Sequence, residues 1–398
     1  MTTAVSTDTV AAVNRMTARW LATWDGSSGV LSGAGAWPLI ALLAGSADPP
    51  ADAELAAAAG VDATSGVAAA REVMALLAET DGVDAALGLW AQERARVRPE
   101  WRESVGADTV GTLTGDPDTD QRVLDDWARL RTGGLIERFP IQLHPEILLV
   151  LATAIAMRTT WVREFEPGAH APRNGPWAGR QVASLNRTTS DLDDVRVATT
   201  PAGDLTLTAV AGTNGLDVHL VLGPDGVAPG AVLPAAVDVI TGEVPSTAGS
   251  AVLESSAAAG PGVRIVSARK PSVQLTTVPF EVTSDHDLLA AADVFGLKTV
   301  SSSERGYFSR VAETDLYVSD ARQSAIARFT ATGFEAAAVT ALGMRATSLP
   351  VLSAKALAVT YERPFGFVAT HRASGLVLFA GWVSSAPEFS RSRGAFGR

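Results

Sequence analysis

The sequence predicts an α+β fold, because two patterns follow each other along the chain. Apolar residues between Thr7 and Trp24 recur at three- and four-residue spacing, which places them on one helical face. Helical patterns dominate the first hundred residues. After Pro176, short alternating segments are separated by glycine and proline turns, as in antiparallel sheet. Helices followed by sheets are typical of the α+β class.

The individual elements follow from periodicity and stop signals. The longest nearly uninterrupted apolar stretch is 147–157, and the segment 147–161 that contains it is rich in branched side chains and favours a buried central strand, although periodicity alone does not separate this from a buried helix. Segment 223–234 is rich in glycine and proline and indicates a loop. The other helices are expected at 37–43, 67–77, 123–130, with Asp118 to Asp120 as cap, and 285–295. The other strands are expected at 205–210, 217–222, 358–361, 365–370 and 376–383.

Composition bounds the class of protein. The 398 residues are 47% apolar and 19% charged, which is typical of a soluble globular chain, and no apolar run reaches the roughly 18 residues of a membrane span. There is no cysteine, and the net charge of −11 disfavours nucleic acid as a partner. The given N-terminus has no secretory signal, so we expect a cytoplasmic protein, or an extracellular one if a signal has been removed.

The motifs that most directly announce an enzyme or a metal site are not found. Asp116, Asp118 and Asp120 have the spacing that opens a calcium loop, but Gln121 and Trp127 stand where it requires glycine and glutamate. Helix capping is the better interpretation. The five histidines are scattered, and each is interpreted as a surface or loop residue. No nucleophile elbow, Walker loop or dinucleotide fingerprint occurs, so we expect no catalytic residue, metal or cofactor.

An ordered series of segments resembles the serpin family, the serine protease inhibitors. The C-terminal segments are 278–288 (VPFEVTSDHDL), 295–297 (FGL), 316–320 (LYVSD), 333–341 (GFEAAAVTA), 361–365 (YERPF) and 378–383 (LFAGWV). Upstream, the segments 87–92, 125–127 and 149–161 resemble the family's helix and central-strand segments, so the likeness spans nearly the whole chain. The excess of arginine over lysine, with many glycines, is typical of a GC-rich genome and favours a bacterial-type member.

The resemblance implies a single domain over residues 1–398 with about nine helices, three mainly antiparallel sheets and an exposed reactive-centre loop at about 331–357. In this metastable fold, a protease cuts the loop, which then inserts into the large sheet and drags the protease with it. Small residues suit such insertion, because each must enter a close-packed sheet. The hinge residues expected to insert first are Gly333, Phe334, Glu335, Ala336, Ala337 and Ala338.

The bond that the protease cuts is expected near Arg345. Family spacing counted from Gly333 places it between Thr347 and Ser348. A cut after Arg345 instead would suit a trypsin-like protease, whose pocket carboxylate pairs with guanidinium. The segment 333–364 is about six residues longer than is common in the family, so both positions stay open.

Several residues depart from the family pattern. Phe334 replaces a small residue on the face shared with Ala336 and Ala338, and we expect overpacking of about 1–3 kcal/mol when it inserts, relieved by Phe334→Thr. The sheet-opening region keeps Ser32 and has Trp161 at its top. Its other expected members are substituted: Gly35 for serine, Thr153 for asparagine and Gln323 for histidine, and Thr153 and Gln323 are expected to exchange hydrogen bonds.

The sequence is therefore compatible with two functions. The first is inhibition of a trypsin-like or subtilisin-like serine protease by loop cleavage, insertion and covalent trapping. The second is a non-inhibitory role on the same fold, as a small-molecule binder, a chaperone or a recruited pathway enzyme. It is motivated by Phe334, the altered sheet-opening region and the expected lack of an export signal. In either case we expect a monomer that binds neither nucleic acid nor a membrane. An inhibitor or binding protein is favoured over an enzyme.

Overall fold

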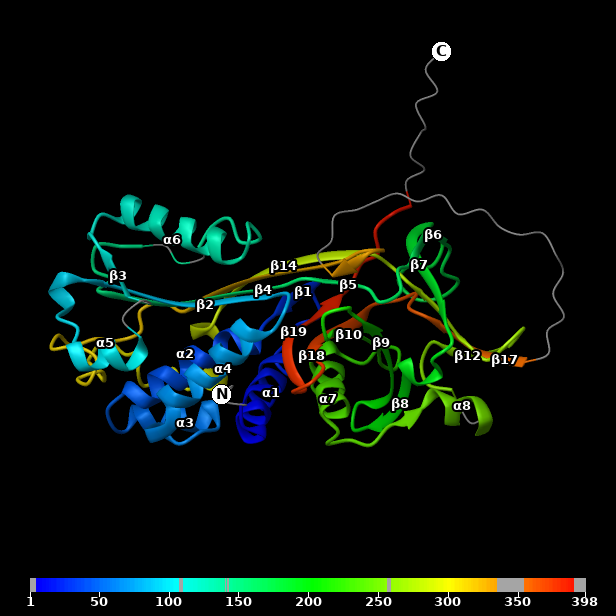
Figure 1. Cartoon of the computed structure of the whole chain (residues 1–398), viewed down its shortest axis with the longest axis horizontal. Coiled ribbons are helices and arrows are strands. Elements are labelled where there is room, and N and C mark those ends of the chain that lie inside the picture. Colours follow the sequence, from blue (N-terminus) through cyan, green and yellow to red (C-terminus); the bar gives the residue numbers. More distant parts are fainter. Residues whose placement is uncertain are drawn as a thin grey trace, which may run out of the picture.

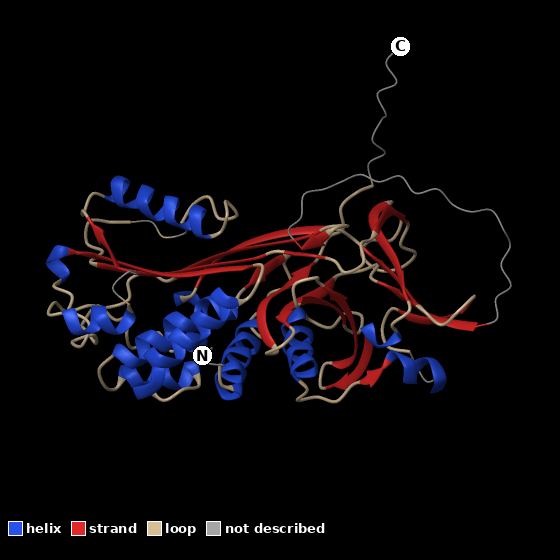
Figure 2. Cartoon of the chain, viewed as in Figure 1, coloured by secondary structure: helices blue, strands red, loops and turns tan. Residues whose placement is uncertain are grey.

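The structure is a computed structural model that describes residues 5–106, 110–139, 141, 143–255, 259–334 and 354–389. The predicted loop residues Glu335, Ala336, Ala337, Ala338, Arg345, Thr347 and Ser348 lie outside the described residues. Within the described chain the α-helices are α1 (Thr7–Leu21), α2 (Gly33–Ser46), α3 (Ala51–Ala59), α4 (Gly66–Glu79), α5 (Pro99–Val105), α6 (Pro117–Arg131), α7 (Pro229–Thr241), α8 (Gly249–Ser255) and α9 (Ala292–Phe295). The α+β prediction is confirmed (Figures 1 and 2).

The described strands form four hydrogen-bonded sheets. A seven-stranded sheet has the order β1 (Gly29–Leu31), β19 (Leu376–Val383), β18 (Phe365–His371), β10 (Leu216–Leu222), β9 (Gly203–Ala211), β8 (Val195–Thr200), β11 (Thr247–Ala248). A five-stranded sheet has the order β12 (Val263–Ala268), β17 (Ala354–Thr360), β13 (Val273–Thr277), β7 (Val182–Thr189), β6 (Glu166–His170). The third and fourth sheets are β14 (Phe280–Asp287), β15 (Arg322–Phe329), β16 (Gly333–Phe334), β5 (Thr159–Thr160), and β3 (Val110–Leu113), β2 (Val83–Gln92), β4 (Leu149–Met157).

The third and fourth sheets form one extended layer. Strand β4 continues through Arg158 into β5, so the three-stranded sheet is covalently joined to the four-stranded one at one end. In Figure 1 their long strands run side by side across the molecule, with α6 above β2 and β4, and with α2 and α4 below. The resemblance predicts three sheets. The described residues form four hydrogen-bonded sheets, because the largest predicted sheet is divided between β4 and β15.

Alternate residues of β4 face two different hydrophobic clusters. Ile155 and Met157 face the main core, which includes α2, whereas Val150 and Ala152 pack with residues of α6 in a smaller cluster. This alternation is the period-two pattern of a strand buried on both faces, and it explains the continuous apolar run in the sequence. The central strand predicted at 147–161 is thus confirmed as β4 and β5.

Three element predictions are wrong in detail. Residues 229–241 form helix α7 although 223–234 was interpreted as a loop, because Pro229 occupies the first helical turn, where proline is tolerated. Residues 285–287 end strand β14, so only the last part of the helix expected at 285–295 is α9. The N-cap of α6 is Asp116, whose side chain accepts a hydrogen bond from Thr119 N, rather than Asp118 to Asp120.

Four of the five histidines are half-buried strand residues and not exposed or loop residues; of these, His170 ends β6 and His371 ends β18. His219 lies within β10, and burial lowers its pKa to about 4. His286 lies within β14, and its Nε2 is 2.8 Å from Val30 O. Alternating strand positions in sheets that pack on one another bury polar side chains that composition alone assigns to the surface.

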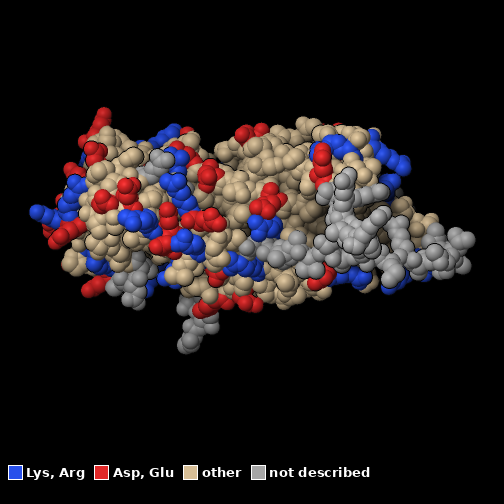
Figure 3. Space-filling view, turned by 90° about the horizontal axis from the view of Figure 1, so that it is seen from above, with Lys and Arg blue, Asp and Glu red and all other residues tan. Residues whose placement is uncertain are grey.

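No helix in the described part of the chain combines the length and apolar character required to cross a membrane. On the face seen from above, acidic and basic side chains are interspersed (Figure 3).

Candidate functional site: a cleft between β4 and β15

The candidate site is the division between β4 and β15. These strands belong to different sheets, and among the described residues the layer is closed only at one end, where β16 pairs antiparallel with both β5 and β15. The register places Phe334 opposite Thr159 on one side and Phe329 on the other. Below this point no backbone pairing joins β4 to β15 among the described residues, and we call this unpaired division, which lies over α2, the cleft.

Phe334 already occupies the closed end of the layer. Its side chain is 2% exposed, and its ring centroid lies 6.3 Å from that of Phe367. Gly333 is required by close backbone approach, since a Cβ there would lie 2.2 Å from Thr159 O. The overpacking expected when Phe334 inserts therefore does not apply as stated, because the intact chain already accommodates this ring.

A tight turn before β16 is held by Trp161. The Trp161 backbone N–H donates to Thr332 O, and its indole Nε1 donates to Thr330 O at 3.0 Å. The indole is 3% exposed and lies 4.9 Å from the Phe329 ring between centroids. The burial expected for Trp161 at the top of the central strand is thus found. Its side chain anchors the turn that leads into β16.

The sheet-opening residues meet at the N-terminus of α2. Ser32 N donates to Gln323 Oε1 at 2.9 Å, and Gln323 Nε2 donates to Ser32 O at 2.8 Å. From the other side of the cleft, Thr153 Oγ1 donates to Gly35 O. A Cβ at Gly35 would lie 2.9 Å from Ile155 Cγ2, so glycine fits the narrow space between helix and sheet.

The structure thus brings Ser32, Gly35, Thr153 and Gln323 together, but with different partners from those expected. Among the hydrogen bonds of the described residues, none joins Thr153 directly to Gln323. Each strand is instead fastened separately to the first turn of α2, Thr153 on the β4 side and Gln323 on the β15 side. The two edges of the cleft are therefore held by the helix below them and not by one another.

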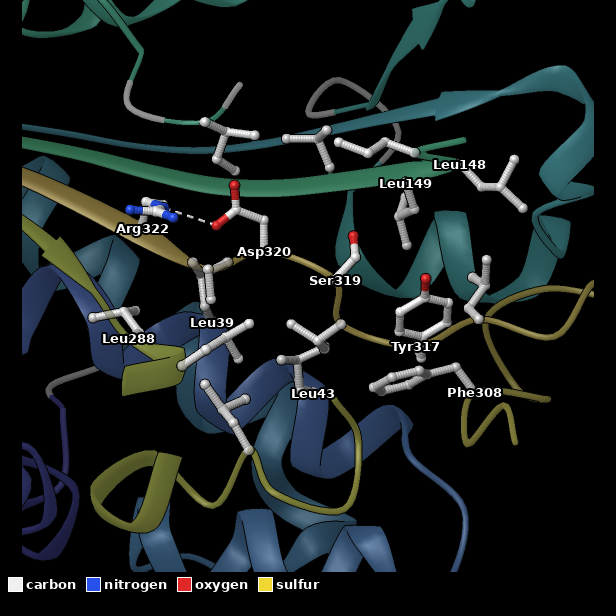
Figure 4. A pocket seen from close by; sticks show the side chains of 18 of the residues that line it. Leu39, Leu43, Leu148, Leu149, Leu288, Phe308, Tyr317, Ser319, Asp320 and Arg322 are labelled. Carbon is white, nitrogen blue, oxygen red and sulfur yellow. Dashed lines mark hydrogen bonds and ion pairs between the residues drawn. The ribbon is translucent and has the colours of Figure 1, made fainter. Parts of the chain in front are cut away.

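The lower end of the cleft widens into a cavity of about 380 Å³, which we call the chamber. Figure 4 shows Leu39 and Leu43 of α2 below it, Leu148 and Leu149 on the β4 side, and Tyr317, Ser319 and Asp320 along the segment that leads into β15. The residues of α2 that line it are apolar, whereas its charged lining residues are exposed or half-buried, and we call the part that these charged residues form the mouth. Arg322 Nε donates to Asp320 Oδ1 at 2.9 Å, and this bond raises the pKa of Arg322.

Two arginines flank the closed end on the outer face of the layer. Arg158 precedes β5, and its guanidinium donates to Asp84 Oδ2 at 2.6 Å. Arg328 of β15 makes a bidentate pair with Glu281 at 2.8 and 3.0 Å, and this pairing lowers the pKa of the Glu281 carboxyl. Phe334 pairs with Thr159 and Phe329, and Arg158 and Arg328 each come one residue before these partners. In an antiparallel register they are therefore the cross-strand neighbours of position 335.

The sequence interpretation did not find the chamber or this arginine pair. The chamber is built by α2, β4 and the segment before β15, which are far apart in the sequence, and its apolar lining looks like any core pattern. The arginines become neighbours only through the β16 register. The signal that was available was the regular i, i+4 spacing of Gly35, Leu39 and Leu43 on one face of α2.

The described architecture defines a class of fold: helices packed on a large layer that is divided between two parallel central strands and closed at one end by a short antiparallel strand. Residues 263–386 match the sequence model of the family described as Serpin (serine protease inhibitor). No curated protein matches the chain in sequence at a significant level.

Solved serpin structures match nearly the whole chain. Cleaved Serpin 42Da has a TM-score of 0.72 at 16% identity, covering 96% of this chain and 98% of its own. Tengpin, a thermophilic serpin in its native state, has a TM-score of 0.70 at 15% identity, covering 95% and 93%. Human thyroxine-binding globulin complexed with thyroxine has a TM-score of 0.70 at 14% identity, covering 96% and 99%. The chain has the serpin fold, and the resemblance indicated by its C-terminal segments is confirmed.

Proposed function

We propose that the chain is an inhibitor of a serine protease that acts by inserting its cleaved reactive-centre loop into the cleft between β4 and β15. The observation that carries this proposal is the β16 register. Because Phe334 pairs with Thr159 and Phe329, each following residue has a defined neighbour on both edges if the strand is extended. The segment 335–346 can therefore be compared with the cleft position by position.

The inward positions of the extended strand match the narrow half of the cleft. Residues that share the face of Phe334 are 336, 338 and 340. Ala336 and Ala338 would lie between Met157 and Ala327 and between Ile155 and Ala325. All four of these neighbours are buried core residues, so small side chains suit the two positions. Thr340 would lie between Thr153 and Gln323. Its hydroxyl could then hydrogen-bond with either side chain, which would join the two separately fastened edges.

The next inward positions match the chamber. Leu342 would lie beside Ala321, and Met344 would lie between Leu149 and Ser319. Alternate strand residues are spaced by about 6.6 Å, and helix residues four apart by about 6 Å. Leu39 and Leu43 therefore follow Gly35 along α2 at nearly the spacing at which Leu342 and Met344 follow Thr340. The two large apolar residues of the segment coincide with the wide, apolar part of the cleft.

The first outward position offers charge complementarity. Glu335 would lie between Arg158 and Arg328, the two arginines at the closed end of the layer. Both are already paired with carboxylates, so Glu335 would join an existing ion-pair network on the outer face. Exposed pairs of this kind are worth no more than about 1 kcal/mol each, so we assign Glu335 a role in setting the register and not a dominant share of the energy.

The length of the cleft agrees with both candidate cleavage positions. The extended register reaches the first residue of β4, Leu149, at Met344. A cut after Arg345 or between Thr347 and Ser348 frees the whole inserting segment, so a trypsin-like or subtilisin-like protease is the proposed partner.

The test is incubation of the chain with trypsin-like and subtilisin-like proteases, followed by denaturing gel electrophoresis and mass spectrometry of the nicked product. We expect cleavage between Arg345 and Ser348 and a covalent complex that survives denaturation. An Ala338→Arg variant places a long charged side chain at an inward position and should be cut without forming complex, whereas the outward variant Ala337→Arg should retain it. If both variants and the original chain are cut equally without any complex, inhibition is excluded.

The second candidate is a binding protein that does not inhibit proteases. Thyroxine-binding globulin, which shares the fold, is described in complex with a small molecule. In this chain, the intact structure holds a chamber of about 380 Å³ and a hinge residue already buried in the layer. Cleavage without complex, together with retained ligand binding, would favour this function.

A further inference from the structure

The chamber combines an apolar floor with an acidic mouth. Leu39, Leu43 and Phe308 contribute to the floor. Its volume of about 380 Å³ lies within the usual range of small-molecule sites, about 300–1,000 Å³. At about 30 Å³ for each water-sized group, it has room for roughly a dozen non-hydrogen atoms. A ligand of that size would be held mainly by contact with aliphatic side chains.

The charged groups that line the chamber are mostly carboxylates. They are Glu146, Asp287, Asp315 and Asp320, against the single guanidinium of Arg322 and the imidazole of His144. Arg322 is bound to Asp320 at 2.9 Å and lies 3.4 Å from Asp287. Within the described chain, Glu146 and Asp315 form no ion pair, so two carboxylates at the mouth have no cationic partner among the lining residues. The net charge of the whole chain, −11, acts in the same direction.

We propose that the chamber is a binding site for a small amphipathic cation, an alkyl chain of about eight carbons that ends in a guanidinium or ammonium group. The alkyl chain lies on Leu39 and Leu43, and the cation lies at the mouth beside Glu146 and Asp315. The chain's own residues 342–345, Leu-Gly-Met-Arg, carry the same combination of aliphatic groups and a terminal cation. One consequence rests on the proposed function: a bound ligand occupies the space for Leu342 and Met344, so it prevents complete insertion and turns an inhibitor into a substrate.

Binding is tested on the intact chain without protease, by titration calorimetry with n-octylguanidinium. The comparison ligands are n-butylguanidinium and octanoate. Each buried methylene is expected to change affinity about fourfold, so the butyl compound should bind at least about 100-fold more weakly. Octanoate has the same chain with the opposite charge and should not bind detectably. Equal binding of octanoate and n-octylguanidinium, or no binding of either, would overturn the proposal.

Variants locate the site. Leu43→Trp adds bulk to the floor and should abolish binding of n-octylguanidinium. Glu146→Gln removes one exposed carboxylate and should weaken binding about two- to fivefold, whereas Glu137→Gln, an exposed carboxylate that does not line the chamber, should leave it unchanged. If Leu43→Trp does not fold, the comparison of Glu146→Gln with Glu137→Gln and the comparison of the three ligands still test whether the ligand binds in the chamber. Unchanged affinity in Glu146→Gln and equal affinity in Glu137→Gln would place the ligand elsewhere.

The consequence is measured separately, as the fraction of chain trapped by a trypsin-like protease with and without saturating n-octylguanidinium, after checking that the ligand does not inhibit the protease itself. A fall in the covalent fraction supports both proposals. Calorimetric binding without any covalent complex in either condition supports the chamber and rejects protease inhibition. Covalent complex without calorimetric binding supports protease inhibition and rejects the chamber as a binding site for this cation.

Discussion

Phe334→Ala tests whether the hinge is seated in the intact chain. The ring is 2% exposed and pairs across the layer with Phe329 and Thr159. Truncating a buried phenylalanine costs about 3–5 kcal/mol. With an unfolding entropy of about 2.1 cal/mol/K per residue, a chain of 398 residues should lose about 4–6 °C in melting temperature.

The assay is thermal unfolding of the intact chain followed by far-ultraviolet circular dichroism, with Val162→Ala as the control. Val162 lies near the same end of the layer but is 66% exposed, so its truncation should change stability by no more than about 0.5 kcal/mol. A Phe334→Ala chain that melts within 1 °C of the unchanged protein would refute the seated hinge.

The same structure reverses the expectation for Phe334→Thr. Overpacking slows insertion only if the ring must enter the layer after cleavage, and here it is buried beforehand. We therefore expect the covalent fraction with a trypsin-like protease to stay the same or fall in Phe334→Thr. A clear rise would show that the ring does limit insertion, as the sequence alone suggested.

Three further outcomes are expected. Trp161→Ala should destabilise the intact chain by about 3–5 kcal/mol in chemical denaturation, because it removes a buried indole and the anchor of the hinge turn; a change below about 0.5 kcal/mol would contradict this. Gly35→Ala should cost about 1–3 kcal/mol, since the new Cβ meets Ile155 Cγ2 at 2.9 Å, and unchanged stability would mean that α2 and the sheet are not tightly apposed there. Burial lowers the pKa of His219 to about 4 in the folded chain, below its unfolded value near 6.5. Between these two pH values the unfolded chain binds a proton that the folded chain does not, so the free energy of unfolding falls as the pH falls from 6.5 toward 4. Denaturation at several pH values should show a smaller loss over this range in His219→Gln, and an identical loss would exclude the histidine as its source.

The fold class could be predicted from the sequence because β4 and the C-terminal strands carry strong local patterns. Strand β4 contributes apolar residues to a hydrophobic cluster on each of its faces, and strands β18 and β19 lie within a few residues of their expected bounds. Helix α7 was missed because Pro229 and Pro234 are loop signals unless tertiary burial of Val232, Leu233 and Ala236 outweighs them. Local signals could not reveal that contribution.

The candidate site was predicted as a set of residues but not as a geometry. Ser32, Gly35, Thr153 and Gln323 do meet, yet Thr153 and Gln323 hydrogen-bond to backbone groups at the start of α2 and not to each other. The sequence could not indicate this, because backbone groups carry no sequence signal. The seated position of Phe334 depends on a two-residue strand whose partners, Thr159 and Phe329, are set by three-dimensional register. The chamber depends on segments up to about 280 residues apart in the chain.

The central claim, insertion in the β16 register, is tested most directly by a cross-strand disulfide. The chain has no cysteine, so a Val339→Cys and Ser324→Cys pair would be its only thiols. The register places these positions opposite one another on the outer face, at a Cα separation of about 4.5–5.5 Å that suits a disulfide. After cleavage at the loop and mild oxidation, we predict a disulfide in this pair and none in Thr340→Cys with Ser324→Cys, whose side chains would lie on opposite faces. No disulfide in the first pair after cleavage, or equal yields in both, would contradict the account.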